Sequence, residues 1–397
     1  MTAIASAPGA LRVFAISIVA RLPVTMLSIG LLVHTRHLTG SFAAAGIVTG
    51  AYGMSLGIGG PLLGRLVDRR GQTAVLVASA GVAAPLLAAV AVMPVGTSPA
   101  VLVALACAIG LAEPPIGACV RTLFPDLLAD DAAVRAAYAA DASASELTWI
   151  AGPPLALGLG AAFSTGTALA VAGAFLLAST LAFALQPASR AWRPAPTERP
   201  RGGSLQTPAM RTLVFVLLAV GVLFGAVEVA VTAATHALGS TAAAGPLLGV
   251  WGAGSLIGGL VAARLGAGLH GPAGLALVLV ALAVGHLALT AATGSVLVLA
   301  AVLLVAGTAI APTYATVYAM VDHAAPAGTV TEAFAWLATA IAIGASAGSA
   351  AAGSLADHAG PVAAFVLAGA AGVAAVLLAL SRSSTLAEPV AAAPAAA

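Results

Sequence analysis

The chain has 397 residues, of which 61% are hydrophobic and only 7% are charged, and its mean hydropathy is +1.09. Soluble domains are about one quarter charged, so this composition excludes a soluble protein and predicts one whose solvent is a lipid bilayer. The formal net charge of only +2 argues against a nucleic-acid partner.

Twelve apolar runs follow one another along the chain, separated by glycine, proline and polar clusters that terminate helices. A helix needs about 20 apolar residues to cross the hydrocarbon core, so each run predicts one transmembrane helix. The first run is longer than a signal-peptide core of about 7–15 residues, and we expect it to be retained. The runs cover residues 10–33, 42–64, 73–93, 98–120, 140–163, 166–186, 211–236, 243–264, 272–292, 295–320, 330–353 and 360–381.

A polar segment rich in proline and arginine divides the twelve runs into two groups of six. We expect an N-terminal six-helix bundle over residues 1–186, a cytoplasmic linker over 187–210, a C-terminal six-helix bundle over 211–383 and a disordered tail over 384–397. If both termini and the linker are cytoplasmic, thirteen of the fifteen arginines lie on that side, the exceptions being Arg21 and Arg36. The positive-inside rule favours this topology. We expect the membrane to be a bacterial cell (inner) membrane.

A short basic turn stands between the second and third runs, in the sequence Gly-Arg-Leu-Val-Asp-Arg-Arg-Gly-Gln of residues 64–72. It resembles the loop between helices 2 and 3 of major facilitator superfamily transporters, with the pattern Gly-x-x-x-Asp-Arg-x-Gly. Gly64, Asp68, Arg69 and Gly71 match this pattern, whereas Gln72 stands where the family usually has a basic residue. The resemblance implies an all-α membrane protein with twelve transmembrane helices in two pseudo-symmetric six-helix bundles.

The same motif suggests how one side of such a protein is held shut. Asp68 ends the second helix on the cytoplasmic side, where it can cap the N-terminus of the eleventh helix, the positive end of its dipole. We therefore expect a conformational latch, whose candidate residues are Gly64, Asp68, Arg69, Gly71 and Glu332.

Four ionisable residues lie inside the predicted helices, where charge is costly and marks a functional site by default. They are Arg21, Glu113, Glu146 and Glu228, on helices that line or flank the central cavity in the facilitator fold. One interpretation is a structural salt bridge between Arg21 and either Glu113 or Glu146. Another is a carboxylate that takes up and releases a proton during transport. Glu228, placed across the cavity, is expected either to bind a proton or cation or to form a solvated wall.

Aromatic residues offer a second set of candidates for the substrate cavity or an inner gate. Tyr314, Tyr318 and Asp322 are spaced four apart on one helical face, and Glu332 and Trp336 repeat this spacing. An interfacial belt of aromatic residues is the alternative. The candidate cavity residues are Trp149, Trp251, Tyr314, Tyr318 and Trp336.

The fifth run contains Gly152 and Pro153, which resemble the Gly-Pro motif in helix 5 of facilitator drug and metabolite exporters. The resemblance favours export. The alternative is an ordinary proline kink, and Thr148 stands where the motif usually has a glycine.

Several classes of function are excluded. The chain has no lysine, so the phosphate-binding pattern Gly-x-x-x-x-Gly-Lys cannot occur and ATP-driven pumping by this chain alone is ruled out. Cys107 and Cys119 are separated by about 18 Å of helix, so neither a disulfide nor a metal site is expected. We expect no enzyme activity, cofactor or metal.

The sequence therefore predicts a secondary transporter that moves a small solute by alternating access and needs no partner beyond the bilayer, so that a monomer suffices. The first hypothesis is a proton-coupled exporter. The second is an uptake symporter or facilitator for a small anionic metabolite, with Arg21 binding the anionic group. Exporters of this kind often carry an acidic residue in helix 1, which Arg21 replaces. The third is a non-transporting membrane sensor.

Overall fold

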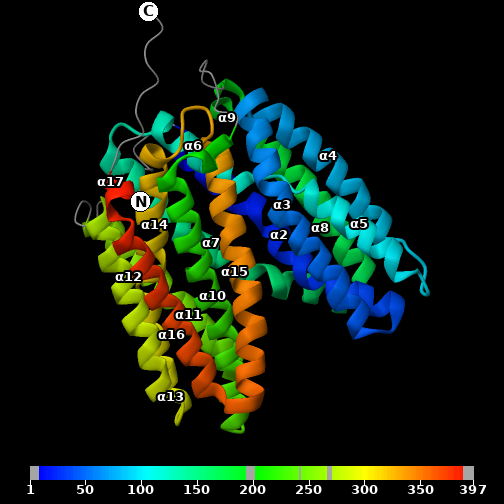
Figure 1. Cartoon of the computed structure of the whole chain (residues 1–397). Coiled ribbons are helices and arrows are strands. Elements are labelled where there is room, and N and C mark those ends of the chain that lie inside the picture. Colours follow the sequence, from blue (N-terminus) through cyan, green and yellow to red (C-terminus); the bar gives the residue numbers. More distant parts are fainter. Residues whose placement is uncertain (1–8, 194–201, 241–242, 266–270, 388–397) are drawn as a thin grey trace, which may run out of the picture.

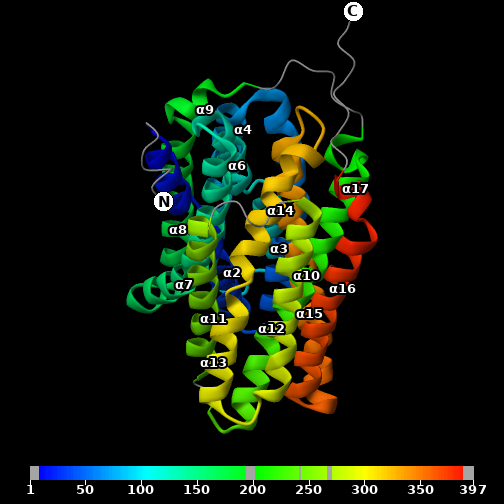
Figure 2. The same cartoon turned by 90° about the vertical axis from the view of Figure 1, so that its left-hand side faces the viewer.

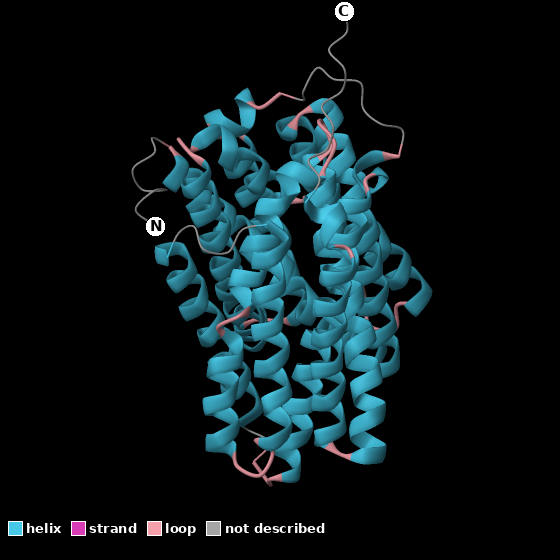
Figure 3. Cartoon of the chain, turned by 60° about the vertical axis from the view of Figure 1, so that its left-hand side comes forward, coloured by secondary structure: helices cyan, strands magenta, loops and turns pink. Residues whose placement is uncertain are grey.

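The computed structural model describes residues 9–193, 202–240, 243–265 and 271–387. These residues are almost entirely helical and contain no strand (Figure 3). The side chain of Glu146 lies outside the described part.

In the described part of the chain, twelve long helices, two of them broken, run between the two ends of the molecule (Figure 1). The first six are α2 (Ala10–Thr39), α3 (Phe42–Arg70), α4 (Gln72–Ala91), α5 (Pro99–Leu111) with α6 (Ile116–Leu127), α7 (Asp131–Ala162) and α8 (Thr165–Ala184). The second six are α10 (Pro208–Ala237), α11 (Ala244–Leu265), α12 (Gly271–Ala288) with η3 (Leu289–Ala291), α13 (Val296–Gly307) with α14 (Ile310–Ala324), α15 (Val330–Ala359) and α16 (Pro361–Ser381). The short helices are α9 (Pro187–Ala191), η1 (Gly203–Gln206) and α17 (Ser383–Ala387).

Ten spans of the described chain are long and apolar enough to cross a membrane, each broken helix counting as one. The long helices α3 and α7 pack among them and complete the set of twelve. The prediction of twelve transmembrane helices in two six-helix bundles is thereby confirmed.

The fourth span is broken because its sequence cannot continue a helix. Pro114 and Pro115 have no backbone N–H, so the usual donors to the carbonyl groups of Gly110 and Leu111 are missing. The helix therefore ends at Leu111 and resumes at Ile116. The tenth span is interrupted at the corresponding place, between α13 and α14.

The polar region before the fifth span is helical, which corrects the predicted boundaries. Asp130 caps α7, because its carboxylate accepts a hydrogen bond from the backbone N–H of Ala133 at 2.8 Å. The helix thus begins at Asp131 rather than near residue 140. Arg135, which the sequence placed in a cytoplasmic loop, therefore lies in α7. Arg121, expected in the same loop, lies in α6, which continues to Leu127.

The segments expected between and after the bundles also contain more helix than the sequence predicted. The expected linker, residues 187–210, contains α9 and η1, and α10 already begins at Pro208. Residues 194–201 of this linker lie outside the described part. In the expected disordered tail, α17 continues to Ala387, and residues 388–397 are not described.

The two bundles meet mainly at one end of the molecule. We call the end at which α9 lies the linker end (Figures 1 and 2). The bundles touch there through α3 and α6 packing on α15 and through α7 packing on α11 and α14. Toward the opposite end Figure 1 shows the two groups of helices diverging.

Glycine allows several of these helices to approach backbone to backbone. A Cβ atom at Gly110 of α5 would overlap the carbonyl oxygen of Tyr52 in α3. One at Gly258 of α11 would overlap the carbonyl oxygen of Thr308. Such close approach is typical of helix packing in membranes.

Candidate functional site

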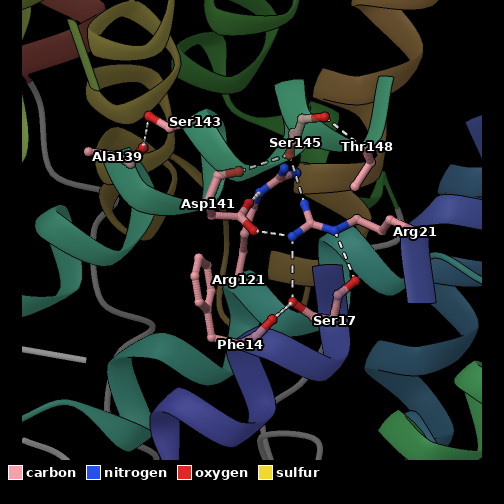
Figure 4. A network of polar contacts seen from close by, with 9 residues as sticks. All are labelled: Phe14, Ser17, Arg21, Arg121, Ala139, Asp141, Ser143, Ser145 and Thr148. Carbon is pink, nitrogen blue, oxygen red and sulfur yellow. Dashed lines mark hydrogen bonds and ion pairs between the residues drawn. The ribbon is translucent and has the colours of Figure 1, made fainter. Parts of the chain in front are cut away.

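A network of two arginines around one aspartate lies within the N-terminal bundle (Figure 4). The carboxylate of Asp141, on α7, is fully buried. It accepts a hydrogen bond from Nη2 of Arg21, on α2, at 2.6 Å, and one from Nε of Arg121, on α6, at 2.8 Å. Two guanidinium groups thus share one carboxylate, so this cluster of described side chains has an excess of one positive charge.

Hydroxyl and carbonyl groups hold Arg21 in place. Its Nη1 donates to Oγ of Ser145 at 2.8 Å, and its Nε donates to the carbonyl oxygen of Ser17 at 3.2 Å. Ser145 in turn donates to the backbone carbonyl of Asp141. The Arg21 side chain is 11% exposed, whereas Asp141 is completely covered. Arg21 is therefore the member of this pair that retains access from outside the packed helices.

The structure pairs Arg21 with a carboxylate that the sequence did not offer as its partner. Arg21 contacts Asp141 rather than Glu113, and the side chain of Glu146 is not described. Because α7 begins about two turns earlier than expected, Asp141 lies well inside the helix and one turn before Ser145. The cap at Asp130 was the sequence signal for this earlier start. Arg121 and Asp141 are the two members of the network that the sequence did not identify.

Arg121 also reaches the other bundle. Its Cζ lies 4.1 Å from the ring centroid of Tyr318, on α14, and 5.9 Å from that of Phe334, on α15. Tyr138, on α7, packs against the same two rings, with centroid distances of 6.1 Å and 5.9 Å. The Tyr138 hydroxyl donates to the carboxylate of Asp322 at 3.4 Å. The rings of Tyr138, Tyr318 and Phe334 form a layer between the bundles, and the guanidinium group of Arg121 packs against this layer.

A second contact between the bundles lies at the end of α3. The carboxylate of Asp68 accepts hydrogen bonds from the backbone N–H groups of Thr331 at 3.1 Å and Glu332 at 2.8 Å. These groups belong to the first turn of α15, so Asp68 caps that helix from the other bundle, at the place expected. Asp68 is only 2% exposed.

Arg65 adds an ion pair to this cap, although the sequence did not single it out. Its Nη2 and Nε donate to the two carboxylate oxygens of Glu332 at 2.8 and 3.1 Å. Gly64 is needed for the close approach, since a Cβ atom there would lie 2.9 Å from the carbonyl oxygen of Thr331. Gly71 ends α3 with a φ of 88°, which favours glycine. Arg69 is exposed.

The two remaining acidic candidates lie apart from this network. Glu113 is in the break between α5 and α6, 2% exposed, and its Oε2 accepts a hydrogen bond from the hydroxyl of Tyr52 at 3.3 Å. Its Oε1 has no hydrogen-bond partner among the described residues. Glu228 is exposed on α10.

Three of the five aromatic candidates, Trp251, Tyr314 and Tyr318, are joined in one row, because the ring of Phe224 lies 5.4 Å from that of Trp251 and 6.1 Å from that of Tyr314. Trp251 is buried in the C-terminal bundle, where its Nε1 donates to Nε2 of His286 at 3.1 Å. Trp149 is 57% exposed, and Trp336 is half-buried. Tyr314 packs on Tyr318, with ring centroids 5.6 Å apart.

The Gly-Pro motif of α7 faces α2. A Cβ atom at Gly152 would overlap the side chain of Thr25, so this glycine lets α7 lie directly against α2. Pro153 continues α7 without ending it. The motif thus packs two helices of the same bundle.

Comparison with known proteins gave consistent results. The model of the Major Facilitator Superfamily matches residues 13–348. The fold resembles that of the human organic anion transporter MFSD10 (TETRAN), with a TM-score of 0.71 and 19% identity over 92% of this chain and 97% of that one. It also resembles a bacterial homologue of the iron transporter ferroportin in its outward-facing state, with a TM-score of 0.72 and 17% identity over 94% and 99%.

A third similar structure is the transporter FucP in its outward conformation, with a TM-score of 0.66 and 15% identity over 93% of this chain and 98% of that one. No curated protein matched the sequence. At these identities the structural likenesses concern the fold alone.

Proposed function

The chain belongs to the Major Facilitator Superfamily, and on this premise we propose that it moves a small organic anion across a bacterial cell membrane by alternating access. In this proposal the protein acts as a monomeric transporter and has no enzyme activity. The charged network supports the substrate class. The arrangement of the two bundles supports the way in which the solute crosses the membrane.

The observation that carries the proposal is the sharing of Asp141 by Arg21 and Arg121. One carboxylate neutralises only one of the two guanidinium groups, and an uncompensated charge within a membrane protein is costly. A carboxylate or phosphate group of a solute would supply the missing negative charge. The planar guanidinium fork suits such groups, because it can donate two parallel hydrogen bonds to them. That one structural neighbour is named an organic anion transporter supports the same class by analogy.

The sidedness follows from the distribution of arginine. Arg65, Arg69 and Arg70 lie at the end of α3, and Arg190 lies on α9, all at the linker end. The positive-inside rule therefore supports a cytoplasmic linker end. On this orientation the contacts between the bundles close the cytoplasmic side. The divergence of the helices toward the other end supports an outward-facing conformation.

Arg121 gives this proposal a mechanism, because the same guanidinium group serves the site and the closure. Its Nε is bonded to Asp141 within one bundle, while its face lies over Tyr318 of the other. A stacked cation contributes roughly 0.5–2 kcal/mol to such a contact. A solute anion that draws Arg121 toward itself would weaken this contact and favour separation of the bundles at the linker end. The bound solute would then face the cytoplasm.

The proton-coupled exporter remains a second candidate. Glu113 and Glu228 are carboxylates on membrane-spanning segments that form no ion pair with any described residue. Such groups are suited to carrying a proton. The observation favours coupling to a proton.

The test uses purified protein in liposomes, with a pH-sensitive dye inside and a panel of solutes matched in size but anionic, neutral or cationic. The proposal predicts flux of anionic solutes, lost in Arg21→Gln and retained in Arg382→Gln, a matched change of an exposed arginine beyond α16. Flux restricted to cationic or neutral solutes would contradict it. Proton movement accompanying flux would establish coupling.

A further inference from the structure

A continuous row of aromatic rings leads away from the charged network into the C-terminal bundle. It begins at Tyr318, whose ring lies under the guanidinium group of Arg121. The ring of Tyr314 lies 5.6 Å from that of Tyr318, and the ring of Phe224, on α10, lies 6.1 Å from that of Tyr314. Trp251, on α11, ends the row at 5.4 Å from Phe224. We call these four side chains the aromatic row.

The middle of the aromatic row is only partly covered. Tyr318 faces the N-terminal bundle, because it contacts Arg121 and Tyr138 there. Tyr314 precedes Tyr318 by one helical turn and so lies on the same face of α14. Tyr318 is 6% exposed, whereas Tyr314 and Phe224 are half-buried. The Tyr314 ring is therefore accessible from the side on which the charged network lies.

A buried histidine fixes the far end of the aromatic row. The Nδ1–H of His286, on α12, donates to the carbonyl oxygen of Leu282 at 2.7 Å. Its Nε2 is therefore the acceptor of the ring, and the indole N–H of Trp251 donates to it at 3.1 Å. The Trp251 ring in turn meets that of Phe224 edge-on, with an interplanar angle of 82°. His286 thus acts on the row as a positioning residue, through Trp251.

We infer that the solute is an aromatic anion, whose acidic group binds Arg21 and Arg121 and whose ring packs on Tyr314 and Phe224. The inference rests on the proposed transport of an organic anion and specifies the apolar part of that anion. Aromatic rings attract one another in offset or edge-to-face contacts by more than the burial of apolar area accounts for. A guanidinium group also favours the face of an aromatic ring. A solute ring finds partners of both kinds between the charged network and the aromatic row.

Two anions separate ring chemistry from charge and size. Benzoate and cyclohexanecarboxylate each carry one carboxylate on a six-membered ring, and the saturated ring is at least as apolar as the aromatic one. A site that only buries apolar surface would therefore not prefer benzoate. The dissociation constants of both anions are measured by calorimetric titration of the purified full chain in detergent at pH 7.

We expect the wild type to bind benzoate about 2- to 10-fold more tightly than cyclohexanecarboxylate, the range typical of one aromatic pair. Phe224→Leu and Tyr314→Leu, which keep an apolar side chain but remove a ring, should each bring the two affinities together. Tyr314→Phe keeps the ring and should keep the preference. The matched control is Phe215→Leu, because Phe215 is 56% exposed and lies on the opposite side of α10 from Phe224; it too should keep the preference.

The positioning role of His286 has its own pair of variants. His286→Leu leaves the N–H of Trp251 without its acceptor and should reduce the preference for benzoate. His286→Gln offers an amide oxygen to the same N–H and should restore it. A purely structural role would lower Tm in His286→Leu without changing the ratio of the two affinities.

Equal affinities of the wild type for the two anions would overturn the inference, as would a preference for benzoate that persists in both Phe224→Leu and Tyr314→Leu. If Phe224→Leu does not yield folded protein, the comparison of Tyr314→Leu with Tyr314→Phe decides. Arg21→Gln should weaken the binding of both anions alike. Equal binding of both anions that is lost in Arg21→Gln would therefore support the anion site while refuting the aromatic preference. Binding of neither anion would refute the proposed function and this inference with it.

Discussion

Replacing Asp68 with asparagine tests the closure of the linker end most selectively. The carboxylate accepts two backbone hydrogen bonds from the first turn of α15, and asparagine offers one oxygen, with its amide N–H₂ turned against the other N–H. Losing one charge-assisted bond costs about 1.5–3 kcal/mol, and losing the charge at the helix N-terminus roughly 0.3–1 kcal/mol more. The total loss of about 2–4 kcal/mol destabilises only the conformation in which the bundles touch at the linker end. At about 1.4 kcal/mol per tenfold, the equilibrium should shift toward opening by roughly 30-fold to several hundred-fold.

A cysteine at position 122 reports this opening, because Thr122 lies between the bundles with its hydroxyl 3.1 Å from that of Thr331. In a background with Cys107 and Cys119 changed to serine, Thr122→Cys should react slowly with a water-soluble maleimide. Adding Asp68→Asn should accelerate labelling at least tenfold. The control is Asp126→Asn, an exposed carboxylate of α6. Equal labelling rates with and without Asp68→Asn would refute the reasoning.

Asp141→Asn removes the carboxylate shared by Arg121 and the partly exposed Arg21, and should cost about 3–5 kcal/mol of stability, more than Arg21→Gln. Because Arg21 and Asp141 are in contact, the double variant should lose less than the sum of both single losses. Additive losses in denaturant titrations would count against the pairing. Glu332→Gln should speed the same maleimide labelling by less than Asp68→Asn does. Its partner Arg65 is 37% exposed, and solvent-exposed ion pairs contribute at most about 1 kcal/mol. Faster labelling in Glu332→Gln than in Asp68→Asn would contradict this prediction. Trp251→Phe leaves a buried histidine nitrogen without its donor, so Tm should fall by an amount equivalent to about 1–3 kcal/mol; an unchanged Tm would mean that this bond contributes nothing.

The fold was predictable because the bilayer imposes strong constraints on sequence. Every lipid-crossing helix must be long and apolar, so hydropathy alone located all twelve. The capping position of Asp68 was predictable because a short motif links a residue type to a fixed place at a helix end. Both signals are local in the chain.

The charged network was only partly predictable, since it depends on which helix faces meet. Residues near Asp131 are polar and read as a loop, yet they begin a helix that packs on the opposite bundle. Hydropathy measures contact with lipid and says nothing of burial between helices. Arg21 was therefore found as a charge in an apolar run, while its partner Asp141 and the second arginine, Arg121, were not.

The central claim is that an anionic solute binds between Arg21 and Arg121, and solute counterflow in liposomes tests it most directly. Liposomes loaded with one unlabelled organic anion should exchange it for the labelled form, without any ion gradient. The account predicts exchange for anions in the wild type, its loss in Arg21→Gln and its retention in Arg382→Gln. Exchange that is unchanged in Arg21→Gln, or confined to neutral or cationic solutes, would contradict the account.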